Sequence, residues 1–143
     1  MAYFTYIQKI LFQHCDTAGI VFYPRYFEMI NATVEAWFDE GLNVPFSELH
    51  LQRGSAIPTV TIDTTFLAPS RLGDVLTISL HITKLGRSSM GLSITGADQG
   101  ASQNAGRFET TLTLVHTNLE TGRPQSWPDD IRATFETLIK DKS

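Results

Sequence analysis

The segment from Pro24 to Glu40 is the feature that most restricts how this chain of 143 residues can fold. Apolar side chains recur through it at three- and four-residue spacing, which predicts a helix. They cover much more than one stripe of that helix, whereas its acidic residues lie along one narrow edge, at Glu28, Glu35 and Asp39. A helix this apolar must be covered on most sides by other parts of the chain. Proline suits its first position, because the N–H that proline lacks would have no partner there.

Most of the chain after this helix predicts an antiparallel sheet. Apolar and polar residues alternate in four segments: 57–67, 75–83, 89–94 and 107–116. Alternation gives each strand one apolar and one polar face, which is typical of an antiparallel sheet with a single covered face. A short turn at 85–87 and a longer hairpin loop at 98–106 connect the last three strands.

The two ends of the chain complete the pattern. Residues 4–14 predict a strand with mixed faces, and residues 129–140 predict an amphipathic helix. The resulting fold class is α+β, with one antiparallel sheet wrapped around a long central helix and a short C-terminal helix. No repeat, linker-like tract or block of charge interrupts the sequence, so we expect residues 1–143 to form a single domain.

Composition narrows the class of protein. The net charge is −4 without any basic run, which argues against binding to nucleic acid. The apolar runs are too short to cross a membrane, and the N-terminal residues lack the pattern of a signal peptide. The single cysteine cannot form an internal disulfide, so we expect a cytoplasmic protein. The four histidines show no metal-ligand spacing with Cys15, and we expect no metal site.

The segment from His14 to Pro24 gives the strongest indication of chemistry. Asp16 follows a strand-like stretch, and a small turn and a short apolar stretch then lead to the start of the helix. This order places a carboxylate near a helix N-terminus, whose free N–H groups attract developing negative charge. A carboxylate facing a polarising N–H is what cleavage of an acyl group requires. Asp16 also fits a structural role, because Asp often caps a turn through the backbone.

The neighbours of Asp16 leave further alternatives open. Cys15 is adjacent to it, but successive strand residues point to opposite faces, so we expect an inert, buried thiol. His14 lies two positions away and could share the face of Asp16 as a supporting group. A structural role for His14 is the favoured interpretation.

The order of elements, together with Asp16-Thr17-Ala18-Gly19-Ile20-Val21-Phe22-Tyr23-Pro24, resembles the hotdog-fold thioesterases. Within them it is similar to the 4-hydroxybenzoyl-CoA thioesterase family, whose signature before the central helix is Asp-x-x-Gly-aromatic. Residues 66–69 and 73–76 resemble a second, weaker motif of the family. The resemblance extends over most of the chain.

The resemblance implies an enzyme that hydrolyses an acyl-CoA thioester to a carboxylate and free coenzyme A. It implies that Asp16 is the catalytic nucleophile or general base, and that the backbone N–H of Tyr23 polarises the thioester carbonyl. Some hotdog thioesterases carry their catalytic carboxylate on the central helix, which makes Glu35 the alternative to Asp16. Phe22 and Glu35 are expected to contact substrate. No cofactor is implied, because coenzyme A is part of the substrate.

One departure from the family bears on the acyl group. Many relatives that act on aliphatic acyl groups have His-Gly where this chain has Tyr23-Pro24. The aromatic-proline pair is similar to members that act on aromatic acyl groups. The sequence therefore favours an aromatic substrate resembling 4-hydroxybenzoyl-CoA.

Coenzyme A carries several phosphate charges, so an acidic protein must gather cations locally. Lys84, Arg87 and Ser88 surround the turn at 85–87, and Arg71 precedes the strand before it. Arginine binds phosphate through a planar fork of donors. The resemblance implies that this turn holds the nucleotide through Arg87 and Ser88, and plain solvation of the turn is the alternative.

The resemblance also implies a homo-oligomer, either a dimer or a tetramer of two dimers, with its sites between subunits. The alternative from another functional class is a non-catalytic hotdog protein that binds acyl-CoA as a sensor or carrier. Asp16 separates the two, because a binder needs no carboxylate at the thioester carbonyl.

Overall fold

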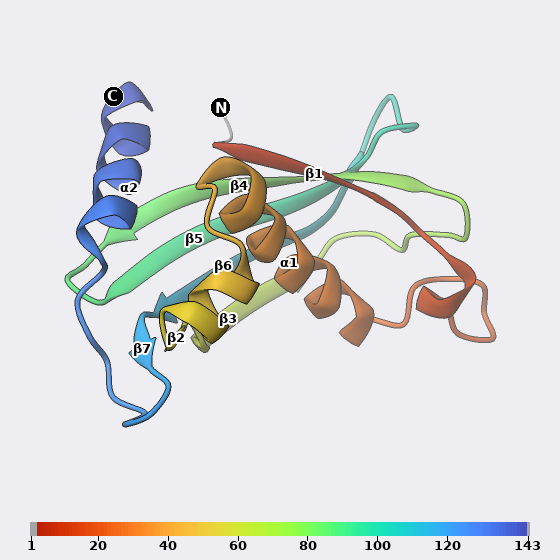
Figure 1. Cartoon of the computed structure of the whole chain (residues 1–143). Coiled ribbons are helices and arrows are strands. Elements are labelled where there is room, and N and C mark those ends of the chain that lie inside the picture. Colours follow the sequence, from red (N-terminus) through yellow and green to blue (C-terminus); the bar gives the residue numbers. More distant parts are fainter. Residues whose placement is uncertain (1–2, 143) are drawn as a thin grey trace.

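The computed structural model describes residues 3–142, which form a five-stranded antiparallel sheet curved around one helix (Figure 1). The central helix α1 spans Pro24–Ala36, and α2 spans Asp129–Lys142. In sheet order the strands are β1 (Phe4–Lys9), β4 (Val75–Leu85), β5 (Ser89–Asp98), β6 (Gly106–Val115) and β3 (Thr59–Phe66). Two short strands, β2 (Ser55–Ala56) and β7 (Thr117–Asn118), pair separately. These elements confirm the predicted α+β hotdog architecture.

The first strand is shorter than the sequence predicts. β1 ends at Lys9, and Phe12–His14 form a short 3-10 helix instead of continuing the strand. The ring Nδ1 of His14 accepts a hydrogen bond from the backbone N–H of Leu11 at 2.9 Å. The prediction of a strand through residue 14 was wrong, because a local side-chain cap satisfies the backbone there.

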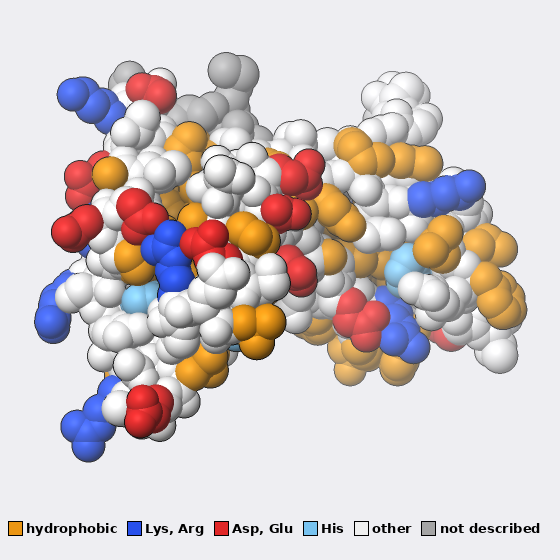
Figure 2. All heavy atoms as spheres, viewed as in Figure 1, with side chains coloured by type: hydrophobic (Ala, Val, Ile, Leu, Met, Phe, Trp, Pro, Cys, Tyr) orange, Lys and Arg blue, Asp and Glu red, His pale blue; other side chains and the backbone are white. Residues whose placement is uncertain are grey.

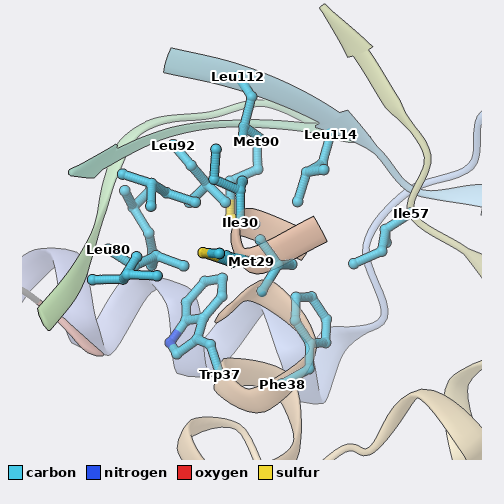
Figure 3. Close-up of a cluster of buried hydrophobic side chains, with 14 of the residues drawn as sticks. Met29, Ile30, Trp37, Phe38, Ile57, Leu80, Met90, Leu92, Leu112 and Leu114 are labelled. Carbon is cyan, nitrogen blue, oxygen red and sulfur yellow. The ribbon is translucent and has the colours of Figure 1, made fainter. Parts of the chain in front are cut away.

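The apolar surface of α1 fills the concave side of the sheet. Helical structure continues past Ala36 through a π-helical turn, Trp37–Gly41, so the helix reaches about as far as predicted. Figure 3 shows Met29, Ile30, Trp37 and Phe38 gathered beneath sheet residues that include Leu80, Met90, Leu92, Leu112 and Leu114. Burying each such large side chain stabilises the fold by about 1.5–3 kcal/mol relative to exposure.

The alternation predicted for β4, β5 and β6 is confirmed by their pairing. Leu80 lies opposite Ile94, and Leu92 lies opposite both Ile82 and Leu112. All of these side chains are buried on the inner face. A shift of one residue in register would turn this whole apolar set toward the outer face, so the pattern fixes the register.

β3 differs from the other strands because it forms one edge of the sheet. Among the described strands it pairs with β6 alone. Val60, Ile62 and Phe66 on this strand are 55%, 43% and 42% exposed. The apolar residues of β3 were predicted to form part of a covered face, but in a single chain they are largely exposed.

The C-terminal helix α2 packs against the far end of α1. Ile131 and Phe135 are buried, and the Phe135 ring stacks on Trp37 with ring centres 5.6 Å apart. Arg53 ties the start of α2 down through an ion pair with Asp130 at 2.8 Å. No helix described within residues 3–142 is both long enough and apolar enough to traverse a bilayer.

Gly96 and Phe108 lie directly opposite each other on β5 and β6. A Cβ atom added to Gly96 would collide with the ring of Phe108, so glycine allows that ring to lie over β5. The fully buried Phe108 ring in turn lies 5.2 Å from the ring of Tyr26 on α1. This glycine therefore sets how closely the sheet and the first turns of α1 approach.

Replacing Gly96 by alanine should destabilise the protein by about 1–3 kcal/mol, because the added methyl overpacks a filled site. The free energy of unfolding, measured by urea denaturation, tests this. Gly100→Ala is the matched control, since its added methyl would meet only the Asp98 carboxylate, at an ordinary 3.5 Å. Equal stability of the two variants would contradict the role assigned to Gly96.

Candidate active site

Asp16 lies in a tight loop that is held by local hydrogen bonds. Its backbone N–H donates to the carbonyl of Ile20, and its carbonyl accepts from the N–H of Gly19, both at 3.0 Å. Gly19 has a φ of +78°, which glycine adopts readily. The carboxylate Oδ1 accepts from the N–H of Ala18 at 2.8 Å, so the turn-capping role is present. The other carboxylate oxygen accepts no hydrogen bond from residues 3–142, and the side chain is exposed.

Tyr23 is the residue at which the helix begins. Its φ and ψ of −53° and −34° are already helical, and its carbonyl accepts from the N–H of Tyr26 at 3.1 Å. The adjacent N–H, of Phe22, donates to the carbonyl of His14 at 2.9 Å. The N–H of Tyr23 finds no acceptor within the described part of the chain. It is therefore a free donor at the positive end of the helix dipole.

An apolar cavity of about 540 Å³ lies beside this helix start. One wall comes from the Asp16 loop and the first turn of α1, and the other from the end of β3 and the linker after it. The lining residues are Ile20, Val21, Tyr23, Tyr26, Phe66, Leu67, Ala68 and Pro69. The Phe66 ring is edge-on to Tyr23 and stacked on Tyr26, each with ring centres 5.7 Å apart. Flat apolar walls of this kind suit a small aromatic group.

The predicted site residue Phe22 lies next to the cavity without lining it. Its ring is 49% exposed and is edge-on to Tyr23, with ring centres 5.6 Å apart. Figure 2 shows hydrophobic side chains gathered at this end of the molecule. The exposed apolar residues of the segments that meet there include Leu11, Phe12 and Leu72.

Glu35 lies elsewhere on the same helix. It is exposed and sits near the end of α1, about 16 Å along the helix axis from Pro24 at the usual rise per residue. A single chain therefore does not bring Glu35 together with Asp16 or with the cavity. The alternative carboxylate belongs to a different region of this chain's surface.

The four residues predicted to bind coenzyme A fall into two groups. Lys84, Arg87 and Ser88 surround the turn between β4 and β5, whereas Arg71 precedes the opposite end of β4. Because β4 has 11 residues, the groups are separated by about 33 Å of strand. Figure 2 shows Lys and Arg side chains scattered over the visible face, without one basic patch.

The backbone around these two groups is held in different ways. The carbonyls of Arg87 and Ser88 accept from the N–H groups of Trp127 (3.1 Å) and His116 (2.7 Å), so the turn is anchored to the segment before α2. Arg71 pairs with Ile20 in an isolated β-bridge, which places it beside the Asp16 loop. Of the predicted cations, Arg71 thus lies near the cavity, and Lys84 and Arg87 do not.

His14 and Cys15 both hydrogen-bond to Leu11. The Sγ of the half-buried Cys15 lies 3.6 Å from the Leu11 carbonyl. His14 is buried, and its ring accepts from the Leu11 N–H instead of reaching Asp16. Burial lowers the pKa of His14, partly offset by nearby Glu28. Residues 3–142 hold no group of three His, Cys, Asp or Glu side chains arranged to bind a metal ion.

Of the eight lining residues, the sequence predicted only Tyr23 as a site residue, and the two aromatic residues that it missed are Tyr26 and Phe66. Tyr26 was treated only as part of the apolar helix surface, although its i, i+3 spacing from Tyr23 puts the two on neighbouring positions of one helix face. That spacing was a usable signal. Phe66 belongs to the motif at residues 66–69, but its place in the cavity depends on the pairing of β3 with β6, which the local sequence does not predict.

The free energy of unfolding should fall as the pH drops below about 6.5, with His14 contributing. Its pKa is lower in the folded than in the unfolded chain, so the unfolded chain binds the extra proton first. Each unit of lowering corresponds to about 1.4 kcal/mol. His14→Asn keeps an acceptor for Leu11 and should flatten the slope between pH 5 and 7, measured by urea unfolding. His50→Asn is the control, and an unchanged slope in His14→Asn would contradict the assignment.

Comparison with known proteins defines the class. A family profile described as the thioesterase-like superfamily matches residues 10–135, and the chain belongs to that superfamily. It is 33% identical over 83 residues to a 4-hydroxybenzoyl-CoA thioesterase of Pseudomonas sp. These 83 residues cover 57% of this chain and 59% of that protein. It is 27% identical over 84 residues to a 1,4-dihydroxy-2-naphthoyl-CoA hydrolase of Synechocystis sp., covering 59% and 60%. The matches thus span less than two thirds of these relatives.

Solved structures match over nearly the whole chain. A Staphylococcus aureus protein in complex with CoA has a TM-score of 0.85 at 19% identity, covering 96% of this chain and 84% of that one. A gentisyl-coenzyme A thioesterase has a TM-score of 0.80 at 26% identity, covering 92% and 99%. The 1,4-dihydroxy-2-naphthoyl-CoA thioesterase of Synechocystis has a TM-score of 0.80 at 22% identity, and the match covers 96% of each chain. The chain therefore has the fold of the hotdog thioesterases.

Proposed function

We propose that this protein is an acyl-CoA thioesterase, which hydrolyses the thioester to a carboxylate and free coenzyme A. The observation that carries the proposal is the unpaired N–H of Tyr23 at the margin of an apolar cavity, in the same loop-and-helix segment as the exposed carboxylate of Asp16. Membership of the thioesterase-like superfamily supports it, as do the relatives whose names describe hydrolysis of aromatic acyl-CoA thioesters.

In the proposed reaction, the thioester carbonyl oxygen accepts a hydrogen bond from the N–H of Tyr23. As the carbonyl carbon is attacked, negative charge grows on that oxygen, and the fixed donor stabilises it most at that moment. The C–S bond then breaks, and the electron pair leaves with sulfur as the coenzyme A thiolate. Thiolate is a good leaving group, so this site needs no strong general acid.

Asp16 can act as a nucleophile or as a general base, and the atoms and charges balance in either route. As a nucleophile, it attacks the carbonyl carbon, forms a mixed anhydride as the thiolate leaves, and is regenerated when water cleaves the anhydride. As a general base, it takes a proton from an attacking water, and that proton then passes to the departing thiolate. Its carboxylate oxygen that accepts no hydrogen bond from the described residues is the atom available for either role.

The proposed acyl group is small and aromatic, resembling 4-hydroxybenzoyl. The cavity walls include the rings of Tyr23, Tyr26 and Phe66, which are arranged edge-on and stacked against one another. A further ring that packs among them gains about 0.5–1.5 kcal/mol beyond simple burial. This amounts to a preference over aliphatic groups of similar size.

For the coenzyme A part of the substrate, we propose that Arg87, Ser88 and Lys84 contact the nucleotide phosphates in a site between subunits, because this turn lies about 33 Å along β4 from the cavity end of its own chain. The anchored turn that carries them supports this role, since a fixed backbone presents the guanidinium at lower entropic cost. Arg71 lies beside the Asp16 loop instead, so its proposed contact is with a part of the substrate closer to the thioester.

The proposed assembly is a homodimer, or a tetramer of two dimers. The free edge of β3 and its exposed apolar residues support a second copy pairing there, because an uncovered edge strand offers a row of unpaired backbone groups. In a two-fold antiparallel pairing, the end of one β3 lies beside the start of the other. Residues of the partner would then border the cavity, whose wall includes Phe66.

The alternative function is a non-catalytic acyl-CoA-binding protein that acts as a sensor or carrier. The hydrogen bond from Ala18 to Asp16 favours it, because this bond gives the carboxylate a purely structural use. The two functions predict different effects of removing the Asp16 charge on the protein's activity.

Asp16→Asn should fold normally and lose at least about 10²-fold in turnover, because the amide can still accept from Ala18 but can neither attack nor accept a proton. Thiol release from an acyl-CoA measures turnover, and urea unfolding checks the fold. Glu35→Gln is the matched control and should retain activity. If Glu35→Gln loses activity and Asp16→Asn does not, the catalytic carboxylate lies on α1. A wild-type protein that binds acyl-CoA without releasing thiol would establish the alternative function.

Benzoyl- and hydroxybenzoyl-CoA should show kcat/KM values a few-fold to about tenfold above those of straight-chain acyl-CoA of similar size, given the energy of ring packing. Side-by-side kcat/KM measurements decide this. A preference for medium or long aliphatic chains would contradict the aromatic assignment and leave the thioesterase assignment intact.

A further inference from the structure

A buried hydrogen bond joins the two walls of the cavity. The Tyr26 hydroxyl, on α1, donates to the Ser70 hydroxyl at 2.7 Å. Both residues are buried, Tyr26 to 3% exposure and Ser70 to 0%. Ser70 comes directly after Pro69, the last residue of the wall that β3 and its linker supply. The bond therefore joins α1 to the end of the linker after β3, two segments that are far apart in sequence.

Ser70 holds the loop wall at a second point. Its carbonyl accepts from the N–H of Val21 at 2.9 Å, and the neighbouring pair Ile20 and Arg71 forms a β-bridge. One residue thus contacts α1 through its side chain and the Asp16 loop through its backbone. This arrangement fixes the linker against both parts of the opposite wall.

The ring of Tyr26 is itself part of the cavity wall. It stacks on Phe66 with an interplanar angle of 28°, and its other ring contact is with Phe108 at 5.2 Å. The backbone N–H of Tyr26 donates to the carbonyl of Tyr23, three residues earlier in the chain, at 3.1 Å. Burial raises the pKa of the Tyr26 phenol, so it remains a neutral donor to Ser70 at physiological pH. The hydroxyl bond is therefore a polar contact that holds this ring in addition to its apolar packing.

We propose that the Tyr26–Ser70 hydrogen bond is a positioning element that sets the width of the acyl cavity and so selects flat acyl groups. This inference rests on the proposed acyl-CoA thioesterase function. With the bond intact, the Tyr26 ring stands at a fixed distance from Leu67 and Pro69 across the cavity. Without it, the ring is held by apolar packing alone, the two walls can separate, and a flat ring loses more contact than a flexible chain does.

Tyr26→Phe is the primary test, because it removes only the hydroxyl and keeps the ring. Ser70→Ala removes the other partner, and the double variant removes both. We expect each to lower the ratio of kcat/KM for benzoyl-CoA to kcat/KM for hexanoyl-CoA by a few-fold to about tenfold. The double variant should fall no further than the more affected single variant, because one bond is lost in all three. Tyr6→Phe, on β1 and away from the cavity lining, is the control and should leave the ratio unchanged.

The outcomes separate selection from general support of the fold. An unchanged ratio in Tyr26→Phe and Ser70→Ala, or an equal loss with both substrates, would overturn the proposal. If the wild-type protein hydrolyses neither substrate, the thioesterase function fails, and the same two acyl-CoA compounds are then titrated by calorimetry. A ratio of the Kd for benzoyl-CoA to the Kd for hexanoyl-CoA that rises in Tyr26→Phe and not in Tyr6→Phe would still establish positioning, and an unchanged ratio would refute it.

Discussion

The burial of α1 in the concave face of the sheet is the interaction on which the other features depend. The helix is too apolar to lie on a surface, and the sheet offers one face lined by large aliphatic residues (Figure 3). Once the middle of the helix is seated there, its first turn must emerge at the margin of the core. The free N–H of Tyr23 thus comes to lie where apolar packing ends and solvent begins.

The cavity is a continuation of the same core, built from aromatic rings at its margin. Phe108 is fully buried against Tyr26, and the more exposed rings of Phe66 and Tyr23 continue this aromatic cluster toward the surface. Few described polar groups border this apolar space: the Tyr23 N–H lies at its margin, the Tyr26–Ser70 pair is buried behind its lining, and the Asp16 carboxylate belongs to the loop that supplies one wall. A site with an apolar interior and few polar groups at its rim strengthens each electrostatic contact it makes.

The sequence predicted those parts of the molecule that depend on local periodicity. Alternation in β4, β5 and β6, the helical spacing after Pro24, and the Asp16-to-Tyr23 segment all led to correct elements. The 3-10 helix at Phe12–His14 escaped prediction because a single side-chain cap decides it. The second cavity wall and the separation of Arg71 from Arg87 escaped because both depend on which strands pair and how long they are. The roles assigned to the site residues stay predictions.

The contact between Gly96 and Phe108 has a consequence for how this chain can change over generations. While position 108 carries a large ring, position 96 has no room for a side chain. Substitutions at the two positions can therefore occur only in one order. The ring must shrink first, and a bulkier residue can then follow on β5. The intermediate would carry a void beneath Tyr26, next to the cavity. Substitutions in the interior of the sheet would therefore pass through a protein with an altered cavity, so changes in the core and changes in the cavity are linked.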